Sequence, residues 1–273
     1  MAGVLKESPI RTNIFTAKES EALEWHLYQK GLSKYERGDV RWLLRHLLTP
    51  KPFSLPQPAV FKVLIIGDGG VGKTTYVNQL NPTGSGAYMD NLGVRLHEIV
   101  LDSNYGKITF CVWDTAGQEK FGKLRDSFYE GADSAIIMFD VASFTSFENV
   151  LMWRQEILRT CGNIPLVLLG NKVDIPNRKV EYRNICQNPV LALLKTYEVC
   201  APSNYQVVQP FVWLAFNLLN APSLQVQPPH LKPAEFRLSR RFIRRLARKQ
   251  TEALFEGIET SSDEDVGTKR TRT

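Results

Sequence analysis

The residues with the clearest chemical potential form a glycine-rich run at positions 67–74. The run reads Gly67-Asp68-Gly69-Gly70-Val71-Gly72-Lys73-Thr74 and matches the pattern G-x-x-x-x-G-K-[ST]. An apolar stretch precedes it and a helical pattern follows it. In that context glycines let successive backbone N–H groups surround phosphate oxygens, and the helix amino terminus adds partial positive charge. We predict a phosphate-binding loop that includes Thr75, with Lys73 on the β- and γ-phosphates and the Thr74 hydroxyl on Mg²⁺.

A second motif, Asp114-Thr115-Ala116-Gly117-Gln118, ends a predicted strand at 107–114. A carboxylate at the end of a strand beside a phosphate loop binds Mg²⁺ directly or through water, and we predict that role for Asp114. Gly117 is predicted to give its backbone N–H to the γ-phosphate, and Gln118 to orient the attacking water. Lys73 and Gln118 are therefore the predicted catalytic residues.

A third motif, Asn171-Lys172-Val173-Asp174, follows a predicted strand at 166–170. An aspartate accepts two hydrogen bonds from N1–H and N2–H₂ of guanine, a pair of donors that adenine lacks. A site built for one base rejects the other because its polar groups are then left unpaired. Asp174, together with Asn171 and Lys172, predicts that the nucleotide is GTP or GDP.

Short apolar runs alternate with helical patterns between residues 60 and 222. Uninterrupted runs such as 135–139 are typical of strands covered on both faces. The alternation predicts an α/β fold with a doubly wound, mostly parallel sheet of six strands and helices on both faces. Strands are predicted at 60–67, 95–101, 107–114, 135–140, 166–170 and 197–201, and helices at 73–80, 147–161, 188–194 and 207–219.

Two appendages flank this predicted domain of residues 60–222. Residues 1–59 contain a helical pattern and then four prolines, which predict a helical extension and a linker. Residues 223–273 contain a linker, a basic helix and an acidic cluster. The net charge is +6, the four cysteines form no C-x-x-C pair, and no apolar run reaches the roughly 20 residues of a membrane span. We expect an intracellular protein with free thiols and, without a terminal cysteine, no lipid anchor.

The three motifs, in this order, resemble those of the Ras-like small GTPases, and the residues between them resemble the Ran family. The likeness covers residues 60–225 and is carried by segments such as 91–94, 112–121, 135–141 and 203–205. It implies a P-loop NTPase that cycles between GDP and GTP states, uses Mg²⁺ and hydrolyses GTP slowly. It also implies importin- and exportin-like transport receptors, GTPase-activating factors and exchange factors as partners, in the nucleus and cytoplasm.

Several positions depart from the Ran pattern. Asn91 stands where the family has the threonine that ligates Mg²⁺, and we expect its amide oxygen to serve there. The guanine loop reads Cys200-Ala201-Pro202 instead of Ser-Ala-Lys, and we expect Cys200 and Ala201 to contact the base. The first switch is one residue short, and the basic run of the family is missing around 186–194. From Asn91 we expect nucleotide binding to persist in a switch that has altered kinetics or a bias toward GDP.

The carboxy-terminal region predicts a basic amphipathic helix at 232–249, with eight basic residues against one acidic. Phe242, Ile243, Leu246 and Ala247 are expected on one face. The helix either docks on the nucleotide-binding domain with a solvated basic face, or binds RNA, an acidic partner or a membrane surface, or serves as a nuclear-import signal. An alternative to the switching enzyme is thus a non-catalytic guanine-nucleotide-binding module that acts through its appended helices.

Overall fold

The computed structural model describes residues 59–82, 86–89, 94–115, 126–221, 223–227 and 229–263. The chain divides into two compact units, Met1–Lys51 and Pro52–Thr273. All described residues belong to the second unit, so the helices and the linker predicted before residue 59 lie outside them. Among the described residues, no helix is both long and apolar enough to cross a membrane.

Seven strands form one sheet in the order β2-β3-β4-β1-β5-β6-β7. The strands are β1 Ala59–Ile66, β2 Gly86–Met89, β3 Val94–Ser103, β4 Gly106–Asp114, β5 Ser134–Asp140, β6 Leu166–Asn171 and β7 Lys195–Glu198. Strands β4, β1, β5, β6 and β7 pair in parallel, and β3 is antiparallel to both of its neighbours. The predicted fold class is confirmed. The sheet has one strand more than the six predicted, because β2 adds an edge strand whose short, glycine-flanked sequence gives little strand signal.

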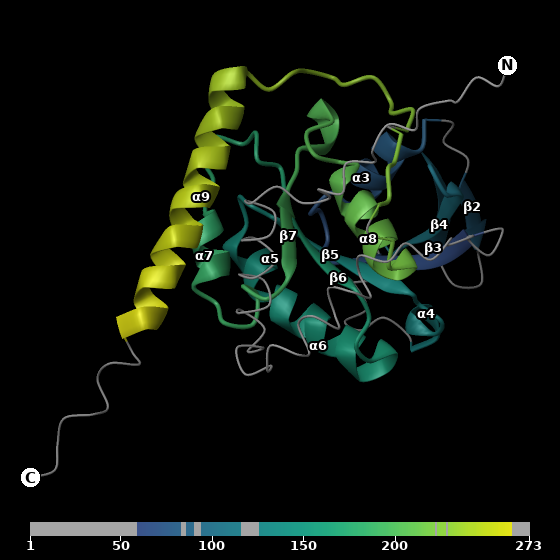
Figure 1. Ribbon diagram of the computed structural model, residues 1–273, viewed down its shortest axis with the longest axis horizontal. Helices are drawn as coiled ribbons and strands as arrows, with labels where there is room; N and C mark the ends of the chain where they lie inside the picture. The colour runs from purple at the N-terminus through teal and green to yellow at the C-terminus, as the bar shows by residue number, and fades with distance from the viewer. Residues whose placement is uncertain are drawn as a thin grey trace, which may run out of the picture. The chain divides into compact units, whose positions relative to one another are not determined.

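The connections between these strands contain α3 Lys73–Leu80, α4 Asp126–Tyr129, α5 Phe144–Glu148, α6 Val150–Cys161 and α7 Tyr182–Cys186, and after the last strand come α8 Gln209–Leu219 and α9 Arg240–Asp263 (Figure 1). Helix α3 has the predicted bounds. The single helix predicted at 147–161 is two helices, and the first starts earlier because Ser143 caps it: the Ser143 hydroxyl accepts a hydrogen bond from the Ser146 N–H at 3.3 Å.

The helix predicted at 188–194 is wrong. These residues form turns, and the helical segment of this region is α7 at Tyr182–Cys186. The Asn188 side-chain oxygen accepts hydrogen bonds from the N–H groups of Val190 and Leu191 at 3.0 and 3.1 Å. The Asn188 side chain thus caps one turn, which the Ala192 N–H closes on the Asn188 carbonyl at 2.9 Å, and the chain does not continue this turn as a helix.

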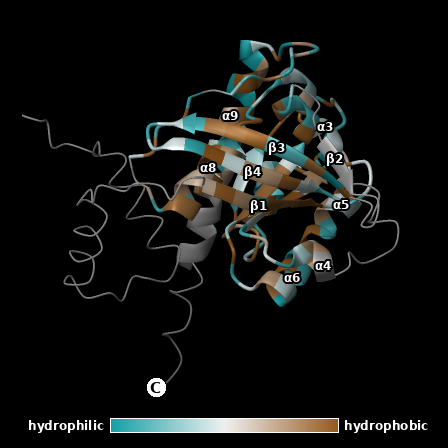
Figure 2. Cartoon of the chain, turned by 90° about the vertical axis from the view of Figure 1, so that its right-hand side faces the viewer, coloured by the Kyte–Doolittle hydropathy of each residue, from teal (hydrophilic) through white to brown (hydrophobic). Residues whose placement is uncertain are grey.

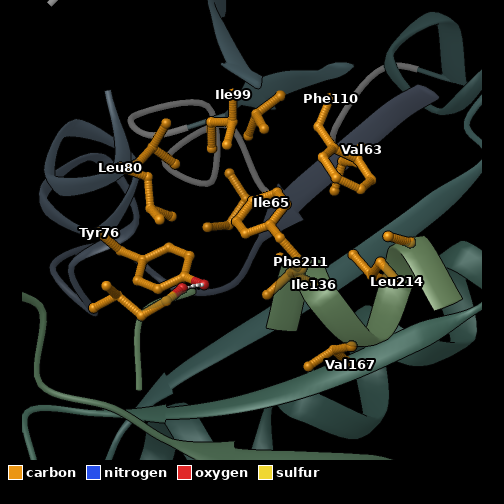
Figure 3. Packing of buried hydrophobic residues seen from close by; sticks show 14 of the residues in the cluster. Val63, Ile65, Tyr76, Leu80, Ile99, Phe110, Ile136, Val167, Phe211 and Leu214 are labelled. Atoms are coloured by element: carbon orange, nitrogen blue, oxygen red, sulfur yellow. Dashed lines mark hydrogen bonds between the residues drawn. The ribbon is translucent and has the colours of Figure 1, made fainter. Parts of the chain in front are cut away.

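The sheet separates two hydrophobic cores, which alternate residues of β1 fill from opposite faces. Val63 and Ile65 join the core under α3 and α8, whereas Leu64 and Ile66 join the core under α4, α5, α6 and α7. Figure 3 shows the first core, where the Tyr76 hydroxyl donates to the Val207 carbonyl at 2.7 Å. Figure 2 shows hydrophobic residues gathered on the strands. Burial on both faces explains the continuous apolar runs seen in the sequence.

Helix α9 lies against α7 (Figure 1, yellow), and both apolar and polar side chains hold it there. Leu246 is buried in the second core and Phe242 packs on it, while Ala247 is exposed. Gln250 Nε2 donates to the buried Glu198 carboxylate at 2.7 Å, and Lys249 Nζ to Glu181 at 3.1 Å. The helix begins at Arg240, eight residues later than predicted, because residues 232–239 form an extended lead-in.

Candidate nucleotide-binding site

The three sequence motifs meet at the carboxyl ends of neighbouring parallel strands. The glycine-rich loop follows β1, Asp114 ends β4, and Asn171 ends β6, while residues 200–201 come just after β7. Strands β2 to β4 lie on one side of β1 in the sheet, and strands β5 to β7 lie on the other. The strand order therefore reverses at β1. In open α/β sheets, this is where ligands bind.

Two glycines of the loop are required by close approaches of other atoms. Gly67 has φ +141°, and a Cβ atom there would lie 2.1 Å from the Met138 carbonyl oxygen on β5. Gly72 has φ +101°, and its Cβ would lie 2.5 Å from Asn171 Nδ2. The loop therefore packs against strand β5 at Gly67 and against the third motif at Gly72. At both positions its backbone lies too close to these neighbours for a residue with a side chain.

The buried ammonium group of Lys73 lies inside the loop. Its Nζ donates to the carbonyl oxygens of Gly67 and Asp68 at 2.7 and 2.8 Å, and the residue is 3% exposed. Beside it, Thr74 Oγ1 donates to Asp114 Oδ2 at 2.6 Å. A hydroxyl and a carboxylate at this distance are both oxygen ligands of the kind that Mg²⁺ takes together with phosphate oxygens. The structure thus brings together three predicted residues from two motifs.

Two side chains of the third motif donate hydrogen bonds to backbone carbonyls of the phosphate loop. Asn171 Nδ2 donates to the Val71 carbonyl at 2.9 Å, and Lys172 Nζ donates to the Gly70 carbonyl and to Asp140 Oδ2, both at 2.7 Å. Lys172 has φ +65°, a left-handed conformation that is uncommon for a residue with a side chain. Such strain persists where surrounding contacts hold it in place and is concentrated at functional sites.

Asp174 is oriented by the residue that departs from the Ran pattern. The Cys200 thiol donates to Asp174 Oδ1 at 3.0 Å. Burial, together with this hydrogen bond to Asp174, raises the pKa of the Cys200 thiol to about 11. The group therefore stays a protonated donor to Asp174 at neutral pH. Ala201 follows as a buried residue at the start of a 3₁₀ turn, Ala201–Ser203.

The carboxylate of Asp68 contacts helix α6, a contact for which the sequence analysis made no prediction. Asn149 Nδ2 and Trp153 Nε1 donate to its two oxygens at 2.7 and 2.8 Å. Asp68 thus contributes its backbone to the loop, while its side chain fastens the loop to α6. Sequence reasoning missed Asn149 and Trp153, and a carboxylate inside a phosphate loop is the signal that calls for such donors.

The lead-in to α9 is bound to the guanine loop, which the sequence did not predict. The Glu235 N–H donates to the Pro202 carbonyl at 2.8 Å, and Asn204 Nδ2 donates to the Lys232 carbonyl at 2.8 Å. Gln79 of α3 also bonds to this segment, accepting from the Lys232 N–H at 3.0 Å. The carboxy-terminal region therefore contacts both the guanine loop and the helix that follows the phosphate loop.

The remaining predicted site residues divide into two groups. Gly69, Gly70 and Val71 lie in the loop, and Thr75 lies exposed on the first turn of α3. Asn91, Gly117 and Gln118 lie outside the described residues, so the roles predicted for them at Mg²⁺, the γ-phosphate and the attacking water stay predictions.

The arrangement fits a guanine nucleotide with Mg²⁺. A Cβ atom at Gly70 would meet no atom within 4 Å, Lys73 places a buried cation in the loop, and the buried Asn171 Oδ1 has no hydrogen-bond partner among the described residues. No cluster of three or more His, Cys, Asp or Glu side chains suited to a metal occurs in the described ranges. Mg²⁺ would be held by Thr74 and Asp114 with the phosphates, where it neutralises charge on the β- and γ-oxygens.

Comparison with known families agrees with this geometry. A profile of the Ras family matches residues 62–220, which is more than half of the chain. The chain belongs to the Ras family and is a GTP-binding small GTPase. The match supports GTP hydrolysis as the general activity of the class, and regulators of the GTPase-activating and exchange-factor kinds as its general partners.

Proposed function

We propose that this protein is a Ran-type switch in nucleocytoplasmic transport, recognised in its GTP form by importin- or exportin-like receptors, in the nucleus and cytoplasm. The observation that carries the proposal is the attachment of the carboxy-terminal region to the nucleotide-binding domain. Its lead-in bonds to Pro202 and Asn204 of the guanine loop, and α9 packs beside Glu198, two residues before Cys200. A tail helix packed on the G domain is a feature of the Ran family, which the sequence resembles.

The chemistry of this switch is transfer of the γ-phosphoryl group of GTP to water. With nucleotide bound, Lys73 would stabilise negative charge on the phosphates, Thr74 and Asp114 would hold Mg²⁺, and Gln118 would orient the water. No arginine finger can be assigned from the sequence, so hydrolysis is expected to be slow until an activating protein contributes one. Asn91, in place of the usual threonine, biases the resting state toward GDP. The substitution Asn91→Thr is expected to tighten GTP relative to GDP, and an unchanged ratio of the two affinities argues against this role.

The transport role is tested by receptor binding in the two nucleotide states. The full chain is loaded with GDP or with a non-hydrolysable GTP analogue and titrated against an importin-type receptor. The proposal expects binding that is at least tenfold tighter in the GTP state, and removal of residues 232–273 is expected to reduce that ratio. Equal affinity in both states, with both nucleotides verified as bound, excludes the transport role while leaving nucleotide binding intact.

A second candidate, a non-catalytic guanine-nucleotide-binding module, is favoured by the guanine loop. Pro202 replaces the lysine of the Ran pattern, and its carbonyl is bonded to the tail lead-in. In this case the nucleotide is a structural ligand, and function lies in the appended segments, with RNA or an acidic protein as partner of α9. Bound nucleotide without any γ-phosphate release, even with an activating protein, would select this alternative.

A further inference from the structure

One side of α9 presents a strip of arginines. Positions 236–249 contain seven basic residues and no acidic residue. Five of these seven are arginines of the helix, and all five are exposed: Arg240, Arg241, Arg244, Arg245 and Arg248. At about 100° per residue, their positions span about 140° around the helix axis. We call this surface the arginine strip.

The arginine strip lies opposite the side of α9 that is docked on the domain. Leu246 and Ala253 are buried on the docked side, where Gln250 Nε2 also donates to the Glu198 carboxylate at 2.7 Å. By the same periodicity, Leu246 and Ala253 are about 150–170° away from the middle of the strip. A ligand on the arginine strip therefore does not compete with the contacts that hold the helix in place.

The charge of the strip is largely uncompensated. Arg248 forms a pair with Glu252 at 3.3 Å, between side chains that are 73% and 56% exposed. Among the described residues, Arg240, Arg241 and Arg244 have no ion-pair partner. Like charges four residues apart, such as Arg240 and Arg244, repel, and positive charge in the first turn opposes the helix dipole. The strip thus disfavours the helix that carries it, and a bound polyanion would remove this cost.

Exposed aromatic rings lie at both ends of the strip. Phe255 is 64% exposed and Phe236 is 40% exposed. The helical periodicity puts Phe255 within the arc of the arginines, about 10 Å along the axis beyond Arg248. Phe236 comes four residues before Arg240 in the lead-in, next to the exposed Arg237. Cationic side chains together with exposed aromatic rings suit a ligand that has phosphates and unpaired bases.

We propose that the arginine strip binds single-stranded RNA while α9 stays docked on the domain. The guanidinium groups donate to phosphate oxygens, for which their planar arrangement of N–H groups is well matched. Phe236 and Phe255 stack on unpaired bases at the two ends. Glu252 marks the border of the strip, where Phe255 takes a neutral base and not a phosphate.

Three other polyanions fit this surface less well. Double-stranded DNA keeps its bases stacked on one another, so the exposed rings have nothing to stack on, whereas RNA presents unpaired bases in loops and at ends. A basic helix binds a membrane by inserting its apolar side, and here Leu246 and Ala253 on that side are buried against the domain. An acidic protein segment offers carboxylates to the arginines but no bases to the rings. The proposal goes beyond the switch function, since it needs neither GTP hydrolysis nor a transport receptor.

The test measures the fluorescence anisotropy of a labelled uridine oligonucleotide of about 12 nucleotides. The full chain is used with GDP and Mg²⁺ in excess, so that the phosphate loop does not take up the RNA. Affinity is expected to fall as salt rises, and five arginine–phosphate contacts give a slope of about −3.5 for log affinity against log salt concentration.

Variants separate the two kinds of contact. The double variant Arg241→Gln with Arg244→Gln is expected to make this slope shallower by about 1.4 and to weaken binding about tenfold or more at low salt. Phe255→Ala is expected to weaken binding about fivefold or more while leaving the slope unchanged. Lys107→Gln, an exposed charge removal on β4, is the matched control and should change neither quantity.

Three results would overturn the proposal. The first is a wild-type chain that does not bind the oligonucleotide at low salt. The second is binding whose strength and salt slope the double arginine variant leaves unchanged. The third is a chain that binds duplex DNA, a polyglutamate peptide or phosphatidylserine vesicles more tightly than the RNA at the same salt concentration. Binding of GDP is measured separately on the same samples, so failure here is distinguished from failure of the nucleotide-binding assignment.

Discussion

Replacing Gly67 by alanine tests how the phosphate loop is seated on the sheet. The new methyl group would lie 2.1 Å from the carbonyl oxygen and 3.1 Å from the carbonyl carbon of Met138. Both atoms belong to the backbone of β5, which pairs with β1 in the centre of the sheet, so neither strand moves without disturbing both cores. The φ of +141° adds about 1–3 kcal/mol of backbone strain. Forcing an extra carbon into a packed site adds about 1–3 kcal/mol more.

The free energy of unfolding is thus expected to fall by roughly 2–6 kcal/mol, against a total of about 5–15 kcal/mol for a domain. Gly70→Ala is the matched control, because Gly70 also has positive φ, at +76°, but a Cβ there meets no atom within 4 Å. Its cost is limited to the left-handed backbone, about 1–2 kcal/mol. Urea unfolding of both variants measures the difference. If Gly67→Ala is no less stable than Gly70→Ala, the close approach to Met138 does not exist and the reasoning fails.

Two further predictions concern the guanine loop and the docked helix. Because the pKa of the Cys200 thiol is raised from 9.0 to about 11, the folded state keeps a proton that the unfolded state releases, and stability falls between pH 9 and pH 11. Cys200→Ser, measured by unfolding at neutral pH and near pH 10, is expected to lose less stability; an equal loss contradicts this. Gln250→Ala removes a hydrogen bond to the buried Glu198 carboxylate and is expected to weaken docking of α9 by about 1–3 kcal/mol. Hydrogen exchange of α9 should rise about tenfold or more, whereas Thr251→Ala, which loses a bond only within the helix, should change it little.

The fold and the centre of the site could be predicted because their signals are local. Apolar runs and glycine patterns depend on neighbours in sequence, so the parallel strands, α3 and the position of Lys73 in the loop followed directly. Thr74 and Asp114 were brought together by their motifs, through the Mg²⁺ role predicted for each, and not by a local pattern. The same reasoning failed at 188–194, where Asn188 caps a single turn that does not extend into a helix. It also placed α9 too early, because positive charge is not a helix boundary signal.

Contacts between distant segments could not be predicted. The bonds of Asp68 to Asn149 and Trp153 span more than eighty residues, and those of the tail to Pro202 and Asn204 depend on the path of an irregular segment. No periodicity encodes such pairs. The types of two residues indicated that a partner was needed, although not which one. A carboxylate beside a phosphate site and a cysteine beside Asp174 both need a specific hydrogen-bond partner.

The most direct test of the central claim is to purify the full chain with Mg²⁺, identify the bound nucleotide by chromatography, and follow γ-phosphate release with and without a Ran-activating protein. We predict bound guanine nucleotide, with GDP in excess, and slow release that the activating protein accelerates. A protein that contains no nucleotide and takes up neither GDP nor GTP would contradict the assignment of this site.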